Sequence, residues 1–206
     1  MPRVKVPRKS THIDMTAMCD VAALLLTFFI LTATARQPEP LPVDTPSSTV
    51  KIKLPPTDIA TLTIGEGKVF FSVAGQQIRY RLLELMGERY QIQFSEDEKK
   101  RFSLMESFGA PITSMKQVIK MGNDQRNQPG VQPGIPTDSV GANASELHDW
   151  IRNARIATKE INNAAMRVSI KGDADEEYPT VKKIIDILQR QEVNKFSLIT
   201  SLEAKD

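Results

Sequence analysis

The chain has 206 residues, enough for about one folded domain with appendages. Its 27 basic and 25 acidic residues give a formal net charge of +2, so it lacks the strong positive field that favours nucleic-acid binding. A single cysteine, Cys19, excludes an intramolecular disulfide, and with only two histidines a His/Cys metal site is hard to assemble. We therefore expect no nucleic-acid partner, no metal and no cofactor.

The first expected element is a membrane-spanning helix over residues 15–35. Its apolar run, residues 17–35, contains one charged residue, Asp20, and as a helix would be about 28 Å long, just enough to cross a bilayer. Basic residues precede this run, and a mostly acidic and polar segment follows it. The positive-inside rule therefore predicts a cytoplasmic basic tail over residues 1–14, with everything after Arg36 outside the cytoplasm.

The same segment also has the features of a cleavable signal peptide. It has a basic start, a short apolar core over residues 21–31 and an Ala33-Thr34-Ala35 cleavage pattern. Asp20 separates the two interpretations, because a carboxylate inside the bilayer costs about 2.5–3.5 kcal/mol on insertion scales, and less near the interface. A signal peptide gains nothing from that charge, whereas a functional membrane helix can use it.

Asp20 belongs to a polar stripe on the expected helix. Asp20, Thr27 and Thr34 recur every seven residues, and Thr16 lies one turn before Asp20. In one interpretation Asp20 stays ionised at the interface and the threonines bond to their own helix. In the other, low dielectric favours the protonated carboxyl, so that Asp20 carries protons and Thr16 and Thr27 serve as proton-path or packing residues. One helix cannot enclose such a path, so partner helices are implied.

An exported domain is expected after this helix. Residues 36–49 are proline-rich and lack apolar periodicity, which predicts an extended linker before a domain over residues 50–206. Alternating or clustered β-branched and aromatic residues predict strands over residues 50–54, 60–64 and 69–73. The last two of these strands are expected to form a hairpin around Gly65-Glu66-Gly67. Residues 80–89 then read as a short helix with a broad apolar side.

The sequence predicts further helices in the middle of the domain, over about residues 91–141. Ser95 and Glu98 fit a capping box, and residues 123–141 are rich in Pro, Gly and Asn, which predicts a loop. Apolar residues at helical spacing lie between these two features: Phe102, Met105, Met115, Val118 and Ile119.

The last third of the chain predicts two helices and two strands. Asn143 and Glu146 fit a second capping box, and Trp150 lies on the apolar face of the helix that follows, where we expect it in the core. A strand with one buried face is predicted over residues 166–171, a helix over residues 179–188 and a final strand over residues 196–200. The sequence therefore predicts an α+β, two-layer domain.

The acidic cluster at residues 173–177 admits a metal interpretation, but it lacks the full loop pattern of a calcium hand. Carboxylates before a helix are favoured by the helix dipole, so a capping and turn role is the better prediction. No motif places a nucleophile beside a base, and no glycine-rich phosphate loop is present. We therefore do not expect an enzyme.

Two blocks of sequence carry a resemblance to a known family. Residues 12–32 place Ile13, Thr16, Asp20 and Val21 on an I-N-x-T-P-L-x-D-V-like motif, although Asp14 and Ala17 replace its usual Asn and Pro. Residues 166–200 follow a strand, A-D-x-D-x-x-Y-x-x-V turn, helix and strand, with matches at Asp173, Asp175, Tyr178, Val181, Asp186 and Val193, and Gly172 in place of Ala. In both blocks the chain resembles the ExbD/TolR biopolymer-transport proteins.

This resemblance implies a proton-driven complex in the bacterial inner membrane. Two copies of the subunit would place their helices inside a ring of ExbB/TolQ-like polytopic subunits and act on a TonB-like or TolA-like partner. The family's proton-carrying aspartate corresponds to Asp20, and the exported domain would be periplasmic. Residues 91–141 depart from the family's compact pattern and are interpreted as a helical insertion, either an accessory elaboration or a docking surface.

Two function classes follow from the sequence. The first is an ion-driven motor subunit, whose output would be TonB-type uptake, Tol-type envelope maintenance or motility. The second is a secreted periplasmic binding module released by signal-peptide cleavage.

Overall fold

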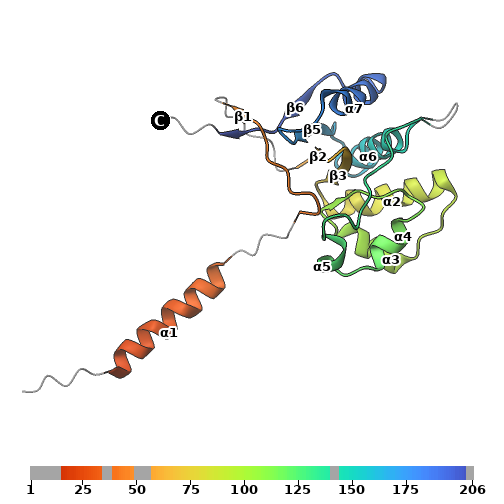
Figure 1. Ribbon diagram of the computed structural model, residues 1–206. Coiled ribbons are helices and arrows are strands. Elements are labelled where there is room, and N and C mark those ends of the chain that lie inside the picture. Colours follow the sequence, from red (N-terminus) through yellow and green to blue (C-terminus); the bar gives the residue numbers. More distant parts are fainter. Residues whose placement is uncertain (1–14, 34–38, 49–56, 140–143, 203–206) are drawn as a thin grey trace, which may run out of the picture. The chain divides into compact units, whose positions relative to one another are not determined.

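The computed structural model describes residues 15–33, 39–48, 57–139 and 144–202. The chain forms two compact units, Met1–Pro38 and Glu39–Asp206 (Figure 1). The predicted basic tail and the predicted strand over residues 50–54 lie outside the described residues.

Among its described residues, 15–33, the first unit contains one helix, α1 (Met15–Thr32). It is long and apolar enough to cross a membrane, and none of its side chains is buried within the structure. No proline or glycine interrupts it, and leucine, alanine and methionine favour the helical backbone. An apolar helix exposed on all sides requires lipid or partner helices around it.

The second unit is built on a five-stranded sheet in the order β4-β3-β2-β5-β6. Its strands are β2 (Ile59–Gly65), β3 (Lys68–Val73), β4 (Ser107–Phe108), β5 (Arg167–Gly172) and β6 (Phe196–Leu198). The β2–β3 and β3–β4 pairs are antiparallel, whereas β2–β5 and β5–β6 are parallel. Glu66 and Gly67 both have positive φ, 52° and 68°, as a tight hairpin turn requires, so the predicted hairpin is confirmed.

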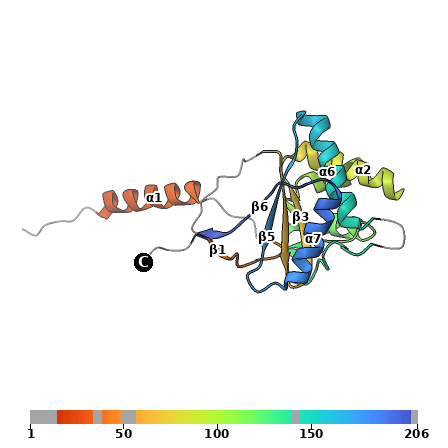
Figure 2. The ribbon, with the colours of Figure 1, turned by 90° about the horizontal axis from the view of Figure 1, so that it is seen from above.

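Three helices cover one face of this sheet: α2 (Gln76–Tyr90), α6 (Glu146–Asn162) and α7 (Tyr178–Arg190). Figure 2 shows the strands edge-on with these helices on the same side. This arrangement confirms the predicted α+β fold. The predicted helix over residues 80–89 is also confirmed, although it begins four residues earlier, and Pro179 lies in the first turn of α7 as expected.

The core lies between the sheet and the helices. Leu62 pairs in register with Phe71 on one side and Ile170 on the other, and all three side chains are buried. Trp150 of α6 is fully buried, as predicted, with its ring centroid 6.1 Å from that of Phe102 and 4.7 Å from that of Phe108. Both partner rings come from residues 91–141.

Residues 91–141 are therefore part of the core. They form α3 (Glu96–Ser103), β4, α4 (Met115–Lys120) and the short α5 (Asn123–Arg126), which lies where a loop is predicted. The Ser95–Glu98 capping box is confirmed, with both reciprocal hydrogen bonds present. The predicted apolar residues are all buried, namely Phe102, Met105, Met115, Val118 and Ile119.

The predicted capping box at the start of α6 is wrong. Asn143 lies outside the described residues, and the N-cap is Ser145, whose Oγ accepts a hydrogen bond from the His148 amide at 3.3 Å. The Glu146 Oε1 atom instead accepts from the Ile112 amide at 2.7 Å and from the Trp150 indole at 3.0 Å. Glu146 thus joins α6 to the 91–141 segment.

Residues 39–48, which the sequence assigns to the linker, lie in the folded unit. Leu41 is buried, and a Cβ added to Gly65 would lie 2.8 Å from Val43 Cγ1 and 3.3 Å from Leu41 Cδ2. The Lys171 ammonium pairs with Glu39 at 2.6 Å. Strand alternation directs Gly65 and Lys171 away from the helices, so this segment covers part of the second face of the sheet.

A second, two-stranded parallel sheet joins β1 (Ser47–Ser48) to β7 (Ser201–Leu202). It connects this early segment to the end of the described chain. The proline-rich composition of residues 36–49 gives no sign of this pairing, because it depends on residues far away in the sequence.

We expect Phe102→Ala to lower the free energy of unfolding by about 3–5 kcal/mol, because the fully buried ring packs against both Phe108 and Trp150. Leu104→Ala, two residues further on, should change it by less than about 0.5 kcal/mol, since that side chain is 58% exposed. Denaturant unfolding of the full chain in detergent, followed by the fluorescence of its single tryptophan, measures both. Equal losses would contradict this placement of residues 91–141.

Candidate functional site

The predicted site residues Thr16, Asp20 and Thr27 all lie on α1. At about 100° per residue, the helix places the three within an arc of about 40°. Asp20 is about 6 Å along the axis from Thr16 and about 10.5 Å from Thr27. The helix thus brings the predicted residues onto one face, in a line.

The threonine hydroxyls of α1 bond along the helix. Thr27 Oγ1 donates to the Leu24 carbonyl at 2.9 Å, and Thr32 Oγ1 donates to the Phe28 carbonyl at 2.8 Å. Such bonds satisfy a hydroxyl in apolar surroundings. Because the Thr27 proton is used inside the helix, only its acceptor lone pairs remain for a neighbour.

Asp20 differs from these threonines. Its side chain is exposed, and it has no hydrogen-bond or ion-pair partner among the described residues. A carboxylate on an apolar helix needs either water, a proton or a partner group. The described part of the chain supplies no such group.

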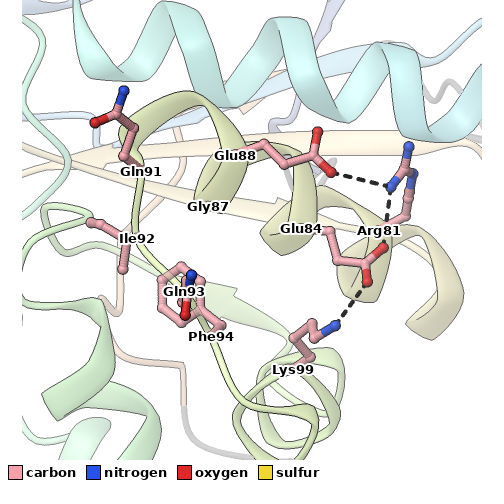
Figure 3. A pocket seen from close by; sticks show the side chains of 9 residues that line it. All are labelled: Arg81, Glu84, Gly87, Glu88, Gln91, Ile92, Gln93, Phe94 and Lys99. Atoms are coloured by element: carbon pink, nitrogen blue, oxygen red, sulfur yellow. Dashed lines mark hydrogen bonds and ion pairs between the residues drawn. The ribbon is translucent and has the colours of Figure 1, made fainter.

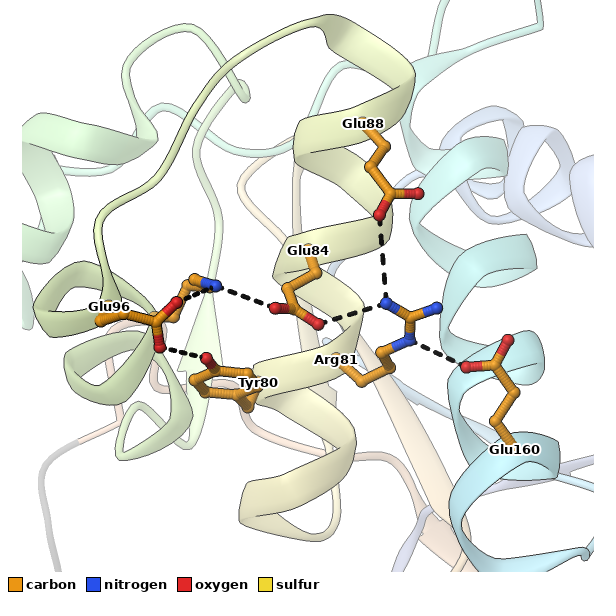
Figure 4. Close-up of polar contacts among 7 residues, drawn as sticks. Tyr80, Arg81, Glu84, Glu88, Glu96 and Glu160 are labelled. Carbon is orange, nitrogen blue, oxygen red and sulfur yellow. Dashed lines mark hydrogen bonds and ion pairs between the residues drawn. The ribbon is translucent and has the colours of Figure 1, made fainter.

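The domain holds its own polar network, which sequence reasoning missed (Figure 4). The Arg81 guanidinium of α2 pairs with Glu160 of α6 at 2.8 Å and with Glu84 at 3.2 Å. The Lys99 ammonium of α3 pairs with Glu84 at 2.8 Å and with Glu96 at 2.5 Å. The Glu84 carboxylate beside it raises the pKa of Lys99, and Lys99 in turn lowers the pKa of Glu84.

This network borders a groove of about 520 Å³ beside α2 and α3 (Figure 3). Its apolar part is formed by Gly87, Ile92 and Phe94, and a Cβ at Gly87 would lie only 2.6 Å from the Ile92 carbonyl oxygen. The two cations that line it, Arg81 and Lys99, both pair with carboxylates. The groove therefore offers a compensated polar rim and no activated nucleophile among the described residues.

A second polar cluster lies between α2 and α6, around the buried side chain of Asp149. The Asp149 carboxylate accepts from the Arg89 guanidinium at 2.6 Å and from the Tyr90 hydroxyl at 3.0 Å, and its other oxygen lies 3.4 Å from His148 Nδ1. Burial raises the pKa of Tyr90, and the carboxylate beside it adds to the increase. The Arg89 charge compensates Asp149, so this cluster fastens the two helices together.

The acidic residues 173–177 stabilise turns. The Asp173 carboxylate accepts from the Asp175 amide at 3.3 Å, and the Glu176 carboxylate accepts from the Gly67 amide of the β2–β3 turn at 3.1 Å. The predicted turn role is confirmed, but Glu177, the N-cap of α7, makes no side-chain capping bond. Within the described residues no group of three or more His, Cys, Asp or Glu is arranged to hold a metal ion.

These features define a protein with one apolar N-terminal helix of membrane-spanning length and an α+β domain that has no recognisable catalytic centre in its described residues. The family profile described as "Biopolymer transport protein ExbD/TolR" matches residues 7–203, nearly the whole chain, so the chain belongs to the ExbD/TolR family. No curated protein and no solved structure matches it.

Membership confirms the resemblance of the two sequence blocks. It implies biopolymer transport energised by the proton-motive force, in association with ExbB/TolQ and TonB/TolA partners. Members of the family are transport-associated proteins and not enzymes. The apolar helix fits a single-pass protein of the inner membrane.

We expect Glu146→Gln to remove a contribution to stability that is lost as the pH rises. Burial raises the pKa of Glu146, so its contribution is full below the unfolded-state pKa of about 4.3 and is lost as the pH rises through the folded-state pKa. Glutamine keeps an acceptor for Ile112 and Trp150 but cannot ionise. The melting temperature of the variant, measured relative to that of the natural chain, should therefore increase between pH 4 and neutral pH.

Thermal unfolding of both chains across this range is the measurement. Glu177→Gln, which removes the charge of an exposed carboxylate, serves as the control for the loss of one negative charge. Identical slopes for Glu146→Gln and the natural chain would show that Glu146 does not titrate differently in the folded state.

Proposed function

We propose that this chain is the proton-channel subunit of an inner-membrane motor, driven by the proton-motive force, that energises TonB-dependent or Tol-type transport across the envelope. The observation that carries the proposal is Asp20, a carboxylate without a described partner on an apolar helix that has no buried side chain. Family membership supports the same role.

In this mechanism Asp20 binds a proton from the periplasmic side and becomes neutral. The neutral helix can then change its orientation within the surrounding ring, because a protonated carboxyl is far less costly in low dielectric than a carboxylate. Release to the cytoplasmic side restores the charge. Each proton supplies about 2.3 kcal/mol per 100 mV, so substantial work on a partner requires several protons.

The proposed assembly contains two copies of the chain within a ring of ExbB/TolQ-like polytopic subunits. It transmits force to a TonB-like or TolA-like partner, with the N-terminus cytoplasmic and the domain periplasmic. The exposed apolar surface of α1 supports this arrangement, since one helix needs neighbours both to enclose a proton path and to cover its apolar side chains.

We expect Asp20→Asn to abolish proton-driven transport, to the level of cells that lack the chain. Asparagine has nearly the same size and cannot exchange a proton, so the variant should still insert and co-purify with its polytopic partner. Asp20→Glu, which keeps a carboxyl group, should retain part of the activity. Proton-dependent substrate uptake by cells is the measurement, and normal uptake by Asp20→Asn would exclude the mechanism.

The intact mass of the membrane-bound chain, measured in the same cells, shows whether its first 35 residues are retained. Retention of residues 1–35 is expected for a motor subunit. A mass that corresponds to a chain beginning after Ala35 would instead support the alternative, a periplasmic binding module released by signal-peptide cleavage.

A substitution at Thr27 tests how far the proton path extends along α1. We propose that it packs against a neighbouring helix, because its hydroxyl proton is already donated to the Leu24 carbonyl. Thr27→Val, which keeps the shape of the side chain and therefore its packing, should retain most of the uptake activity, because no partner depends on the hydroxyl proton. A loss as complete as that of Asp20→Asn would instead place Thr27 on the path.

A further inference from the structure

A groove of about 450 Å³ runs beside α6 and the turn that follows it. Three cations line it at positions i, i+3 and i+7 of the helix, namely Arg152, Arg155 and Lys159. Ile156 and Met166 supply apolar surface between them. This spacing places the three positive charges along one side of α6, away from the buried residues that pack on the sheet.

These cations lack carboxylate partners. Arg152 and Lys159 are exposed and form no ion pair among the described residues, and the Arg155 guanidinium donates to a neutral acceptor, the Gln191 carbonyl, at 2.9 Å. Elsewhere in the domain, Arg81 and Arg89 are both compensated by acidic groups. The groove thus gathers three positive charges of one helix, and none of them is paired with a carboxylate among the described residues.

The acidic residues of α6 are all engaged elsewhere. Glu146 accepts hydrogen bonds from Ile112 and Trp150, Asp149 pairs with Arg89, and Glu160 pairs with Arg81. None of these three carboxylates lines the groove. An anion that enters the groove would therefore meet three cations of the helix without competition from the acidic residues of the same helix.

We propose that this groove binds the headgroup of an anionic membrane lipid. The cations suit the phosphate, and the apolar side chains suit the glycerol and upper acyl carbons beside it. The inference rests on the proposed membrane anchoring of α1.

Chain length favours a lipid over an acidic peptide as the occupant. Five residues, 34–38, separate Ala33 from Glu39 in the sequence, and the six Cα–Cα steps between them extend at most about 22 Å. Such a short connection keeps headgroups of the anchoring membrane at a high effective concentration around the domain, an advantage that an acidic peptide not tethered to that membrane does not share.

The test uses the full chain in lipid nanodiscs, made either of phosphatidylcholine alone or of phosphatidylcholine with phosphatidylglycerol. Hydrogen exchange is followed in peptides that cover residues 152–166. We expect slower exchange in the discs that contain phosphatidylglycerol. In Arg152→Gln/Lys159→Gln this protection should be lost, since two basic residues near an anionic surface together contribute about thirtyfold in affinity.

The matched control is Lys120→Gln/Lys182→Gln, which removes the same charge from two exposed lysines outside the groove and should keep the protection. Two further arms use phosphatidylcholine discs, with added inorganic phosphate or with a glutamate-rich peptide. Equal protection by phosphate would show an ion site, and protection by the peptide alone would show a protein-binding site, so either result overturns the inference.

Absence of any difference between the two disc compositions would also overturn the inference, while leaving the proposed function intact. Failure of the full chain to enter discs at all would contradict the membrane anchor, and with it both proposals. Because transport activity is not the readout, the two kinds of failure remain distinguishable.

Discussion

A single carboxylate on an apolar helix imposes two demands that uniform surroundings cannot meet. The apolar side chains of α1 are exposed over its whole length and are best solvated by lipid or by other apolar helices, whereas Asp20 requires water, a proton or a polar partner. The polar stripe occupies an arc of about 40°, so most of the helix surface remains for lipid and for packing. An assembly with partner helices on the Asp20 side satisfies both demands at once.

The α+β domain, unlike α1, is stabilised by an apolar core of its own. Trp150 stacks with Phe102 and packs against Phe108, so the helices of residues 91–141 share one core with the sheet and with α6. The Glu146 carboxylate adds a polar link at the same junction, through the Ile112 amide. Residues 91–141 therefore cannot be regarded as a separable appendage, because removing them would expose the side chain at the centre of the domain.

Much of this fold follows from local sequence signals. The β2–β3 hairpin is predictable because its turn needs positive φ at two positions, and the start of α3 because Ser95 and Glu98 satisfy each other's amides. The same local reasoning fails at Glu146, where long-range donors compete for the carboxylate. It also fails at residues 39–48, because a proline-rich composition does not reveal that Leu41 fits against Gly65 on the far face of the sheet.

The two candidate sites, Asp20 and the cations of α6, also differ in how far the sequence alone reveals them. Asp20 is visible in the sequence because one charge interrupts a long apolar run, but the described part of this chain contains no partner group for it. The cations of α6 are spaced as i, i+3 and i+7, a pattern that the sequence does contain, yet the pattern gains meaning only when the neighbouring carboxylates are known to be engaged. Because Glu160 lies directly after Lys159 and Asp149 lies three residues before Arg152, the sequence of α6 looks charge-balanced. Folding separates those charges, directing the acidic groups towards α2 and leaving the basic groups together in the groove.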